Sequence, residues 1–273
     1  MNLRYEWVFL LVEKPFRLLH ISDVHFSART THEQNLRVTD AILEQVQSVH
    51  CPVPDSPDIS TPLEAICITG DLLSRNSHQE TFDDALLLLQ RLRECLPDTA
   101  LLYSLGNHEM DYPDDVRNAY LRSARELGVT VLDNESTLVN GICFTGLTVP
   151  QTVYRNPKGG YRNLSAMTRE MVESCLGSNA HHPCVLLAHS PLGFSAYAEW
   201  GADVVLSGHV HGGIVRIGEI GLLSPERKFL PRYTKGIFKE NGCSMIVSAG
   251  IGKFRVNNPP EVICLDIKPE VEA

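Results

Sequence analysis

The 273-residue sequence contains no apolar run long enough to cross a membrane as a helix. Near the N-terminus the longest such run extends only from Trp7 to Val12, whereas a helical span needs about 20 residues. This run is also too short for the core of a signal peptide, and no small-residue cleavage site follows it. The sequence therefore predicts a cytoplasmic protein without a transmembrane segment.

Basic residues are in the minority as well. There are 24 Lys and Arg against 33 Asp and Glu, which gives a formal net charge of −9 with the 11 His neutral. Because an acidic chain repels the nucleic-acid backbone, bulk binding of DNA or RNA is not expected. Apolar residues make up 43% of the chain, which is enough to form a core and excludes disorder as the main state.

The eight cysteines show no CxxC spacing, the spacing that many zinc sites use. Cys67, Cys143, Cys184 and Cys264 lie inside apolar, strand-like runs, where a reduced thiol behaves as a small hydrophobic side chain. Disulfide frameworks belong to short secreted domains rather than to chains of this length. We expect reduced structural thiols, with disulfides or a zinc site as the alternative.

Short apolar runs alternate with amphipathic stretches along the whole chain. The runs have the length of buried strands, and they are Arg17–Ser22, Ala65–Gly70, Ala100–Leu105, Cys184–His189, Asp203–Ser207 and Ser244–Ala249. The stretches with helical character are Glu33–Val49, Thr81–Leu96, Asp114–Leu127 and Ser165–Leu176. This order predicts an α/β protein with at least one largely parallel sheet.

Two segments depart from the alternation. Val129–Leu147 contains three strand-like pieces without a helix, and Glu261–Ile267 adds a late strand, so part of the sheet structure should be antiparallel or mixed. The proline-rich segment Cys51–Pro62 predicts an exposed loop. In the absence of a linker or an internal repeat, we expect residues 1–273 to form one domain.

Five of the predicted strands run into His, Asp or Asn residues. The strand ends are Asp23-Val24-His25, Gly70-Asp71, Gly106-Asn107-His108-Glu109, His189 and Gly208-His209-Val210-His211. Ligands of α/β sheets bind beyond the carboxyl ends of the strands, so these side chains should meet at one edge. On extended backbone, the pairs Asp23/His25 and His209/His211 would each point to one side.

Apart from His108 and Glu109, these strand ends supply two carboxylates, one carboxamide and four imidazoles. Seven donors exceed the four ligands of an ordinary zinc site, and they suit two divalent cations that share one carboxylate. Mixed nitrogen and oxygen ligands favour Mn, Fe or Zn over Ca or Mg. The pattern therefore predicts two divalent transition-metal ions, with manganese favoured.

The motifs, in this order, resemble the signature of the calcineurin-like metallophosphoesterase family, Dx[H]…GD…GNH[DE]…H…GHxH, which is complete from Asp23 to His211. Downstream, GHVHGG, PRYTKGIF at 231–238, SAGIG at 248–252 and PPE at 259–261 resemble the YkuE-type branch of this family. The resemblance covers nearly the whole chain. It implies a sandwich of two mixed β-sheets flanked by helices.

The resemblance also implies a role for each motif residue. Asp23, His25 and His211 would hold one metal ion, Asn107, His189 and His209 would hold the other, and Asp71 would bridge them. His108 would stabilise or protonate the leaving oxygen, and Glu109 would orient its loop. The implied reaction is hydrolysis of a phosphodiester or pyrophosphate bond by a metal-bridging hydroxide, without a covalent intermediate.

One position departs from the pattern. Many relatives read GDxxD, in which the last Asp supports the catalytic histidine, whereas this chain has Ser74 there. A hydroxyl holds an imidazolium less strongly than a carboxylate does. Either another acid such as Asp111 replaces the missing carboxylate, or His108 has a lower pKa.

Two segments, Gln151–Asn163 and Glu226–Glu240, are locally basic, and we expect them to form surface loops. They are either ordinary solvated loops or a rim that grips an anionic substrate, which would be a phosphorylated small molecule or a lipid-linked phosphate. The candidate substrate-binding residues are Arg155, Arg162 and Arg232, with Tyr161, Phe229, Tyr233 or Phe238 packing on an apolar or ring portion.

Two alternative functions follow from the same resemblance. One is a pyrophosphohydrolase of a UDP-diacylglucosamine-type lipid precursor, which would need an apolar groove or a membrane-facing patch. The other is a non-catalytic scaffold that binds a protein partner, which would be expected to lose metal ligands or the catalytic histidine. This chain keeps all seven ligands and His108, which favours an enzyme.

Overall fold

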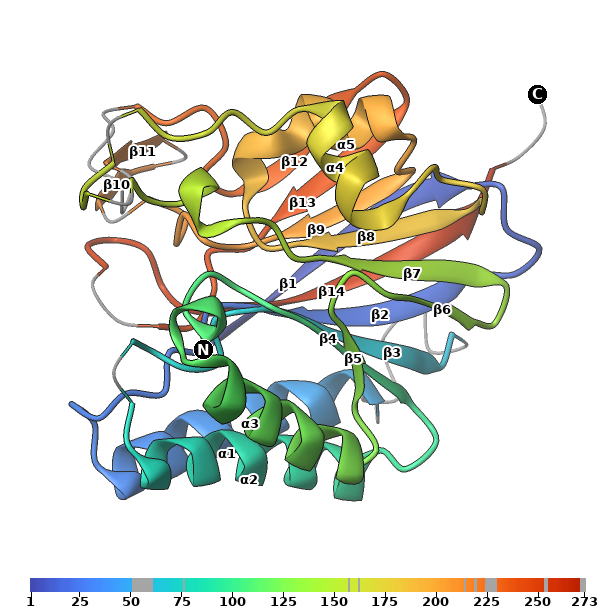
Figure 1. Ribbon diagram of the computed structural model, residues 1–273. Helices are drawn as coiled ribbons and strands as arrows, with labels where there is room; N and C mark the ends of the chain where they lie inside the picture. Colours follow the sequence, from blue (N-terminus) through green and yellow to red (C-terminus); the bar gives the residue numbers. More distant parts are fainter. Residues whose placement is uncertain are drawn as a thin grey trace.

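The computed structural model describes residues 1–50, 61–75, 77–156, 158–161, 163–213, 215–218, 220–223, 230–252 and 255–270. Within these residues two six-stranded sheets stack face to face, and helices cover both outer faces (Figure 1). The predicted α/β class and the two-sheet sandwich flanked by helices are confirmed. Most of the predicted proline-rich loop, residues 51–60, lies outside the described residues.

The first sheet has the strand order β1-β14-β2-β3-β4-β5. Its strands are β1 (Asn2–Leu10), β2 (Phe16–Ile21), β3 (Leu63–Thr69), β4 (Ala100–Ser104), β5 (Thr130–Leu132) and β14 (Glu261–Pro269). Strands β2 to β5 are parallel, whereas β14 runs antiparallel to β2. Helices α1 (His32–His50), α2 (Gln79–Cys95) and α3 (Asp114–Glu126) cover its outer face (Figure 1).

The second sheet has the order β12-β13-β9-β8-β7-β6. Its strands are β6 (Ser136–Val139), β7 (Ile142–Leu147), β8 (Cys184–Ala188), β9 (Val204–Ser207), β12 (Gly236–Glu240) and β13 (Cys243–Val247). The four inner strands are parallel and both edge strands are antiparallel to their neighbours. Helices α4 (Arg169–Leu176) and α5 (Phe194–Trp200) cover it, and β10 (Val215–Ile217) pairs with β11 (Ile220–Leu223) separately.

Three apolar layers explain why the inner strands read as continuous apolar runs. In β2, Leu18 packs between the two sheets while Leu19 packs under the helices. In β8, Leu186 packs under α4 and α5, whereas Leu187 packs between the two sheets. Strands that are buried on both faces have no polar side and lose the alternating pattern.

The structure differs from the sequence-based predictions at several elements. Strand β1 was not predicted because its outward row, which includes Tyr5, Trp7 and Phe9, is exposed and yet apolar. Helix α4 begins at Arg169 rather than Ser165. The predicted loop Glu226–Glu240 is wrong in its last part, because residues 236–240 form β12.

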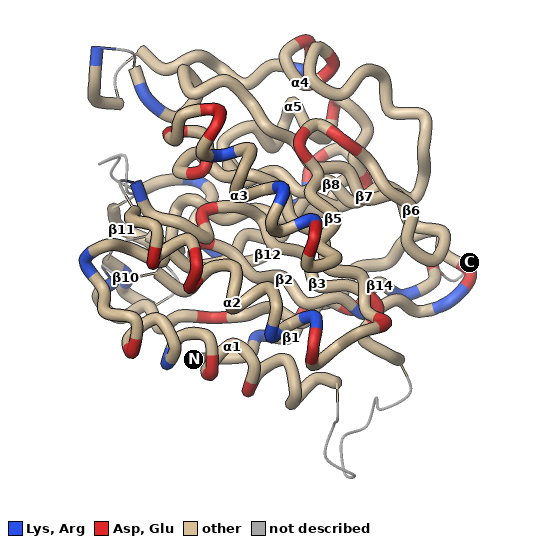
Figure 2. Tube along the Cα trace, turned by 60° about the horizontal axis from the view of Figure 1, so that its bottom comes forward, with Lys and Arg blue, Asp and Glu red and all other residues tan. Residues whose placement is uncertain are grey.

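Charge on the helical side of the molecule is mixed. Each of α1, α2 and α3 contains both acidic and basic residues (Figure 2), and in α2 and α3 most of the acidic residues precede the basic ones. In the described part of the chain, no helix is both long enough and apolar enough for a membrane span.

Candidate metal centre

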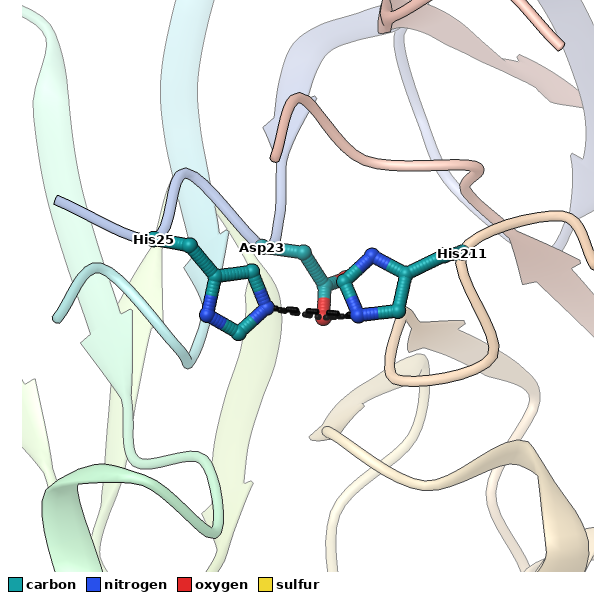
Figure 3. Close-up of side chains that lie close together, drawn as sticks. All are labelled: Asp23, His25 and His211. Atoms are coloured by element: carbon teal, nitrogen blue, oxygen red, sulfur yellow. Dashed lines mark hydrogen bonds and ion pairs between the residues drawn. The ribbon is translucent and has the colours of Figure 1, made fainter. Parts of the chain in front are cut away.

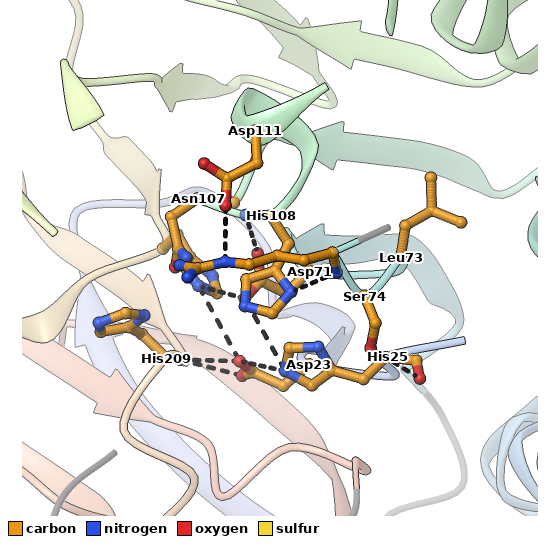
Figure 4. A network of polar contacts seen from close by, with 12 residues as sticks. Asp23, His25, Asp71, Leu73, Ser74, Asn107, His108, Asp111 and His209 are labelled. Carbon is orange, nitrogen blue, oxygen red and sulfur yellow. Dashed lines mark hydrogen bonds and ion pairs between the residues drawn. The ribbon is translucent and has the colours of Figure 1, made fainter. Parts of the chain in front are cut away.

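The polar side chains that follow β2, β3, β4, β8 and β9 come together where the two sheets meet. Figure 4 shows those that follow β2, β3, β4 and β9. Because these strands are parallel within each sheet, their carboxyl ends lie at one edge. Contacts that join the sheets include the 3.2 Å approach of His189 Nε2 to Asp71 Oδ2 and the His209 N–H donated to Asp23 Oδ2 at 3.0 Å.

A first group of potential ligands consists of Asp23, His25 and His211 (Figure 3). Asp23 Oδ1 lies 3.7 Å from His25 Nε2 and 3.8 Å from His211 Nε2. The two Nε2 atoms lie 3.3 Å apart, so both rings present a nitrogen to the same space. This geometry is what a cation between the three side chains requires.

A second group consists of Asp71, His189 and His209. His189 Nδ1–H donates to the Thr69 carbonyl at 2.7 Å, so its Nε2 is the atom that faces Asp71. Metal-ligating histidines are commonly oriented by such a bond at the other ring nitrogen. The rings of His189 and His209 pack edge to face with centroids 5.0 Å apart.

Asp71 lies between the two groups. Its Oδ2 approaches His189 Nε2 at 3.2 Å and His25 Nε2 at 3.8 Å. Asp71 also forms a third grouping with His25 and His108. The predicted position of Asp71 at the middle of the cluster agrees with this arrangement.

Asn107 has the one carboxamide of the predicted set. Its Oδ1 is buried and has no hydrogen-bond partner within the described residues, although a buried acceptor without a donor costs free energy. The Gln151 side chain donates to the Asn107 carbonyl at 2.5 Å and holds this loop in place. The unpaired oxygen is therefore available to a cation.

The backbone of the ligand loops is left-handed rather than extended. Five of the seven predicted ligands, Asp23, His25, Asp71, His209 and His211, have φ between 50° and 66°. The extended backbone under which the i, i+2 pairs would point to one side is therefore not present, although the side chains still converge. Such φ values are uncommon for residues other than Gly and often occur at functional sites.

Two glycines permit this close approach of the loops. A Cβ on Gly208 would lie 1.9 Å from Ser22 Oγ and 2.2 Å from Asp23 Oδ2. A Cβ on Gly106 would lie 2.1 Å from Asp71 Oδ1. Both carboxylates occupy space that any side chain at these positions would fill.

Glu109 organises two of the loops. Its carboxylate accepts the backbone N–H groups of Asp71 at 2.8 Å, Gly106 at 2.9 Å and Leu73 at 3.2 Å. The prediction that Glu109 orients its loop is confirmed, and the same contacts extend its effect to the loop after β3.

Charges within the site stabilise each other. Burial raises the pKa of Asp23, but the nearby imidazoles of His211, His25 and His189 have a larger effect and hold that pKa below its ordinary range. Burial lowers the pKa of His189, but the carboxylates of Asp71 and Asp23 have a larger effect and raise the pKa of His189 to about 10. The two buried carboxylates thus favour positive charge at the place where a cation would bind.

His108 is supported by a backbone amide. The Arg75 N–H donates to His108 Nδ1 at 3.1 Å, while the Ser74 hydroxyl contacts the His25 carbonyl instead. Asp111 pairs with Arg75 and Arg155 and does not replace the missing carboxylate. Burial, and then His25 and Arg75, outweigh Asp71 and lower the pKa of His108 to about 4, as the second sequence-based alternative predicted.

A cavity of about 270 Å³ opens over these residues, and its lining includes Arg75, His108, Tyr154 and Tyr161. Tyr161 was among the candidate aromatic contacts. Arg75 was not predicted, because nothing in the sequence marks it apart from its place four residues after Asp71.

The three predicted substrate arginines fall in different places. Arg155 pairs with Asp111 and lines an adjoining cavity. Arg232 lies exposed, with its guanidinium carbon 4.9 Å from the centre of the Tyr233 ring, and Tyr233 packs in the core against Phe238. Arg162 and Phe229 lie outside the described residues.

Comparison with known proteins shows the family of this chain. A model of the calcineurin-like phosphoesterase family matches residues 16–213. The phosphodiesterase YaeI of Escherichia coli is 24% identical over 262 residues, which cover 93% of this chain and 82% of that protein. The metallophosphoesterase YkoQ of Bacillus subtilis, whose function is uncharacterised, is 23% identical over 270 residues, with coverage of 93% and 84%. The YkuE-type branch stays a prediction.

Among solved structures, a candidate 5′-nucleotidase from Staphylococcus aureus superimposes with a TM-score of 0.51 at 15% identity. The match covers 86% of this chain and 49% of the other, so this chain spans about half of that structure. At this identity the likeness shows the fold alone. The family match over most of the chain, joined to the clustered Asp and His side chains, leads to one conclusion: the chain belongs to the calcineurin-like phosphoesterase family and is a metal-dependent phosphoester hydrolase.

Proposed function

We propose that the protein hydrolyses a phosphodiester or pyrophosphate bond with two divalent cations. The position of Asp71 carries the proposal, because this carboxylate groups with His25 on one side and with His189 and His209 on the other. A carboxylate shared by two ligand groups supports a pair of ions. The first ion would be held by Asp23, His25 and His211, the second by Asn107, His189 and His209, and both by Asp71.

The donors fit such ions. Asn107 Oδ1 and His189 Nε2 are both buried without a hydrogen-bond partner among the described residues. The mixture of imidazole and oxygen donors suits Mn, Fe or Zn, and manganese is the ion we propose. When bound, a pair of divalent ions lowers the pKa of water and neutralises phosphate oxygens.

The contribution of the chain itself to the reaction centres on His108. Because the Arg75 N–H occupies Nδ1, the hydrogen of the neutral imidazole lies on Nε2, 3.8 Å from Asp71 Oδ2. From this position the Nε2–H group can donate to the leaving oxygen of a phosphoester in the cavity. Arg155 would contact the anionic remainder of the substrate. The name of YaeI supports a diester as the bond that is cleaved.

Metal analysis and a substrate pair test the proposal. Protein loaded with Mn²⁺ should contain close to two ions per chain, and Asp71→Asn should weaken the binding of both. Loss of a single ion in that variant would contradict the shared role. The loaded protein should hydrolyse bis(p-nitrophenyl) phosphate faster than p-nitrophenyl phosphate. A lack of turnover across diesters, monoesters and pyrophosphates would favour the scaffold alternative.

We also propose that the chain acts as one domain in the cytoplasm. The cluster takes residues from the ends of strands in both sheets, so neither sheet could form it alone. All seven described cysteines are free thiols, which fits a reducing compartment.

A further inference from the structure

Arg75, Asp111 and Arg155 form an ion-pair cluster beside the metal centre. Arg75 Nε lies 2.6 Å from Asp111 Oδ2, and Arg155 Nη2 lies 2.5 Å from Asp111 Oδ1. Each guanidinium therefore takes a different oxygen of one carboxylate. The Asp111 side chain is only 9% exposed, whereas those of Arg75 and Arg155 are 34% and 42% exposed.

The cluster has more positive charge than Asp111 can neutralise. Two guanidinium groups face one carboxylate, so one positive charge remains. A guanidinium has five N–H donors in a planar fork, and Asp111 can accept only part of them. The remaining donors are available to another anion.

The cluster opens to a space that adjoins the site. Arg75, Asp111 and Arg155, with Tyr112 and Pro113, line a cavity of about 510 Å³. Arg75 also lines the smaller cavity over His108 and the metal ligands. One arginine thus forms part of the wall of both cavities, and an anion that it binds would lie next to the reacting phosphate. Figure 4 shows Asp111 beside Asn107 and His108.

Hydrogen bonds hold both arginines relative to the metal ligands. The Arg75 N–H donates to His108 Nδ1 at 3.1 Å. The Arg155 N–H donates to the Gln151 carbonyl at 2.9 Å, and the Gln151 side chain donates to the Asn107 carbonyl at 2.5 Å. Groups that are already fixed lose less conformational entropy when they bind a ligand.

We propose that Arg75 and Arg155 bind a second phosphate group of the substrate, next to the phosphate that is hydrolysed. This inference rests on the proposed function and narrows its substrate class to compounds with at least two phosphates, such as pyrophosphate-linked nucleotides. The planar fork of arginine matches a phosphate with two parallel hydrogen bonds. Asp111 is the positioning residue that keeps the two forks in place.

The test uses two inhibitors that differ by one phosphate, adenosine monophosphate and adenosine diphosphate, at saturating free Mn²⁺. Inhibition constants are measured on the hydrolysis of bis(p-nitrophenyl) phosphate. For the wild-type protein, the inhibition constant of the diphosphate should be at least about tenfold lower than that of the monophosphate, because charge-assisted hydrogen bonds would hold the second phosphate. This ratio should fall toward one in Arg155→Ala and in Arg75→Ala, and Arg155→Lys should recover part of it.

Arg169→Ala is the matched control, because Arg169 also pairs with a carboxylate, Glu173, but lies on the surface of α4. This control should keep the wild-type ratio. Equal binding of both nucleotides to the wild type, or an unchanged ratio in Arg155→Ala, would overturn the inference. Calorimetric titration gives the same ratio without turnover. If the protein hydrolysed no ester, the proposed function would be contradicted. The ratio of the affinities for the diphosphate and the monophosphate would still test whether Arg75 and Arg155 bind a second phosphate.

Discussion

One buried carboxylate holds together the loops that follow β3 and β4, and removal of its charge should weaken the fold and the metal centre together. Glu109 is 1% exposed. It accepts the N–H groups of Asp71 and Gly106 at Oε2 and that of Leu73 at Oε1. In Glu109→Gln one of these oxygens becomes an amide nitrogen, so at least one backbone N–H faces another donor.

The magnitude follows from the lost contact. A hydrogen bond to a charged group contributes about 1.5–3 kcal/mol, and a buried donor without an acceptor costs about 1–3 kcal/mol. We expect the free energy of unfolding of the metal-free protein to fall by about 2–4 kcal/mol. For a chain of this size each kcal/mol corresponds to about 2–4 °C, so Tm should fall by at least about 4 °C. The Asp71 loop loses an anchor, so the affinity for Mn²⁺ should also fall.

Urea unfolding of metal-free protein measures the first effect, and titration with Mn²⁺ measures the second. Glu173→Gln is the control, because this carboxylate lies on the surface of α4 and pairs with Arg169. The control should change stability by less than about 0.5 kcal/mol. If Glu109→Gln matched this control in stability and in metal affinity, the organising role would be refuted.

Three further outcomes follow from the structure. His108→Ala should keep the metal content and lower the turnover of bis(p-nitrophenyl) phosphate by about 10²–10⁴-fold; loss of metal at an unchanged rate would contradict its role. Gly208→Ala should lower the yield of folded protein and Tm, since the new Cβ would lie 1.9 Å from Ser22 Oγ; an unchanged Tm would show that the loops can move apart. Burial, and then Arg4, lower the pKa of His20 to about 3, whereas the unfolded chain binds this proton near pH 6.5. Stability should therefore fall by about 2 kcal/mol for this residue between pH 7 and pH 5, and urea unfolding of His20→Gln should show a shallower pH dependence than the wild type.

The sequence predicted the inner strands well because each is buried on both faces. Cys184–Ala188 is apolar throughout and is followed by His189, while β9 is apolar from Val204 to Leu206 and ends at the polar Ser207. The edge strand β1 was missed for the opposite reason. Its exposed row contains Trp7 and Phe9, so neither polar alternation nor full burial marks it.

The seven candidate ligands could be named from the sequence, since strand ends in an α/β chain point to a common edge. The backbone conformation of these ligands could not be predicted from the sequence. The left-handed φ of Asp23 and His211 depends on loops that contact each other across the two sheets. A local sequence pattern contains no information about this long-range contact between loops.

By itself, the sequence determined the α/β class and the short list of metal-ligand candidates, because these depend on local burial patterns and on residue types at strand ends. The two-sheet sandwich followed from the resemblance of the motifs to a known family. Only the tertiary structure decided how His108 is supported and where the cationic groups lie. The Arg75 amide and the Asp111 pairings arise where loops from different parts of the chain meet, and no periodicity or spacing encodes such a meeting. The sequence contains few basic residues and no carboxylate at position 74, and in the folded protein a backbone N–H and two paired arginines lie beside the histidine instead.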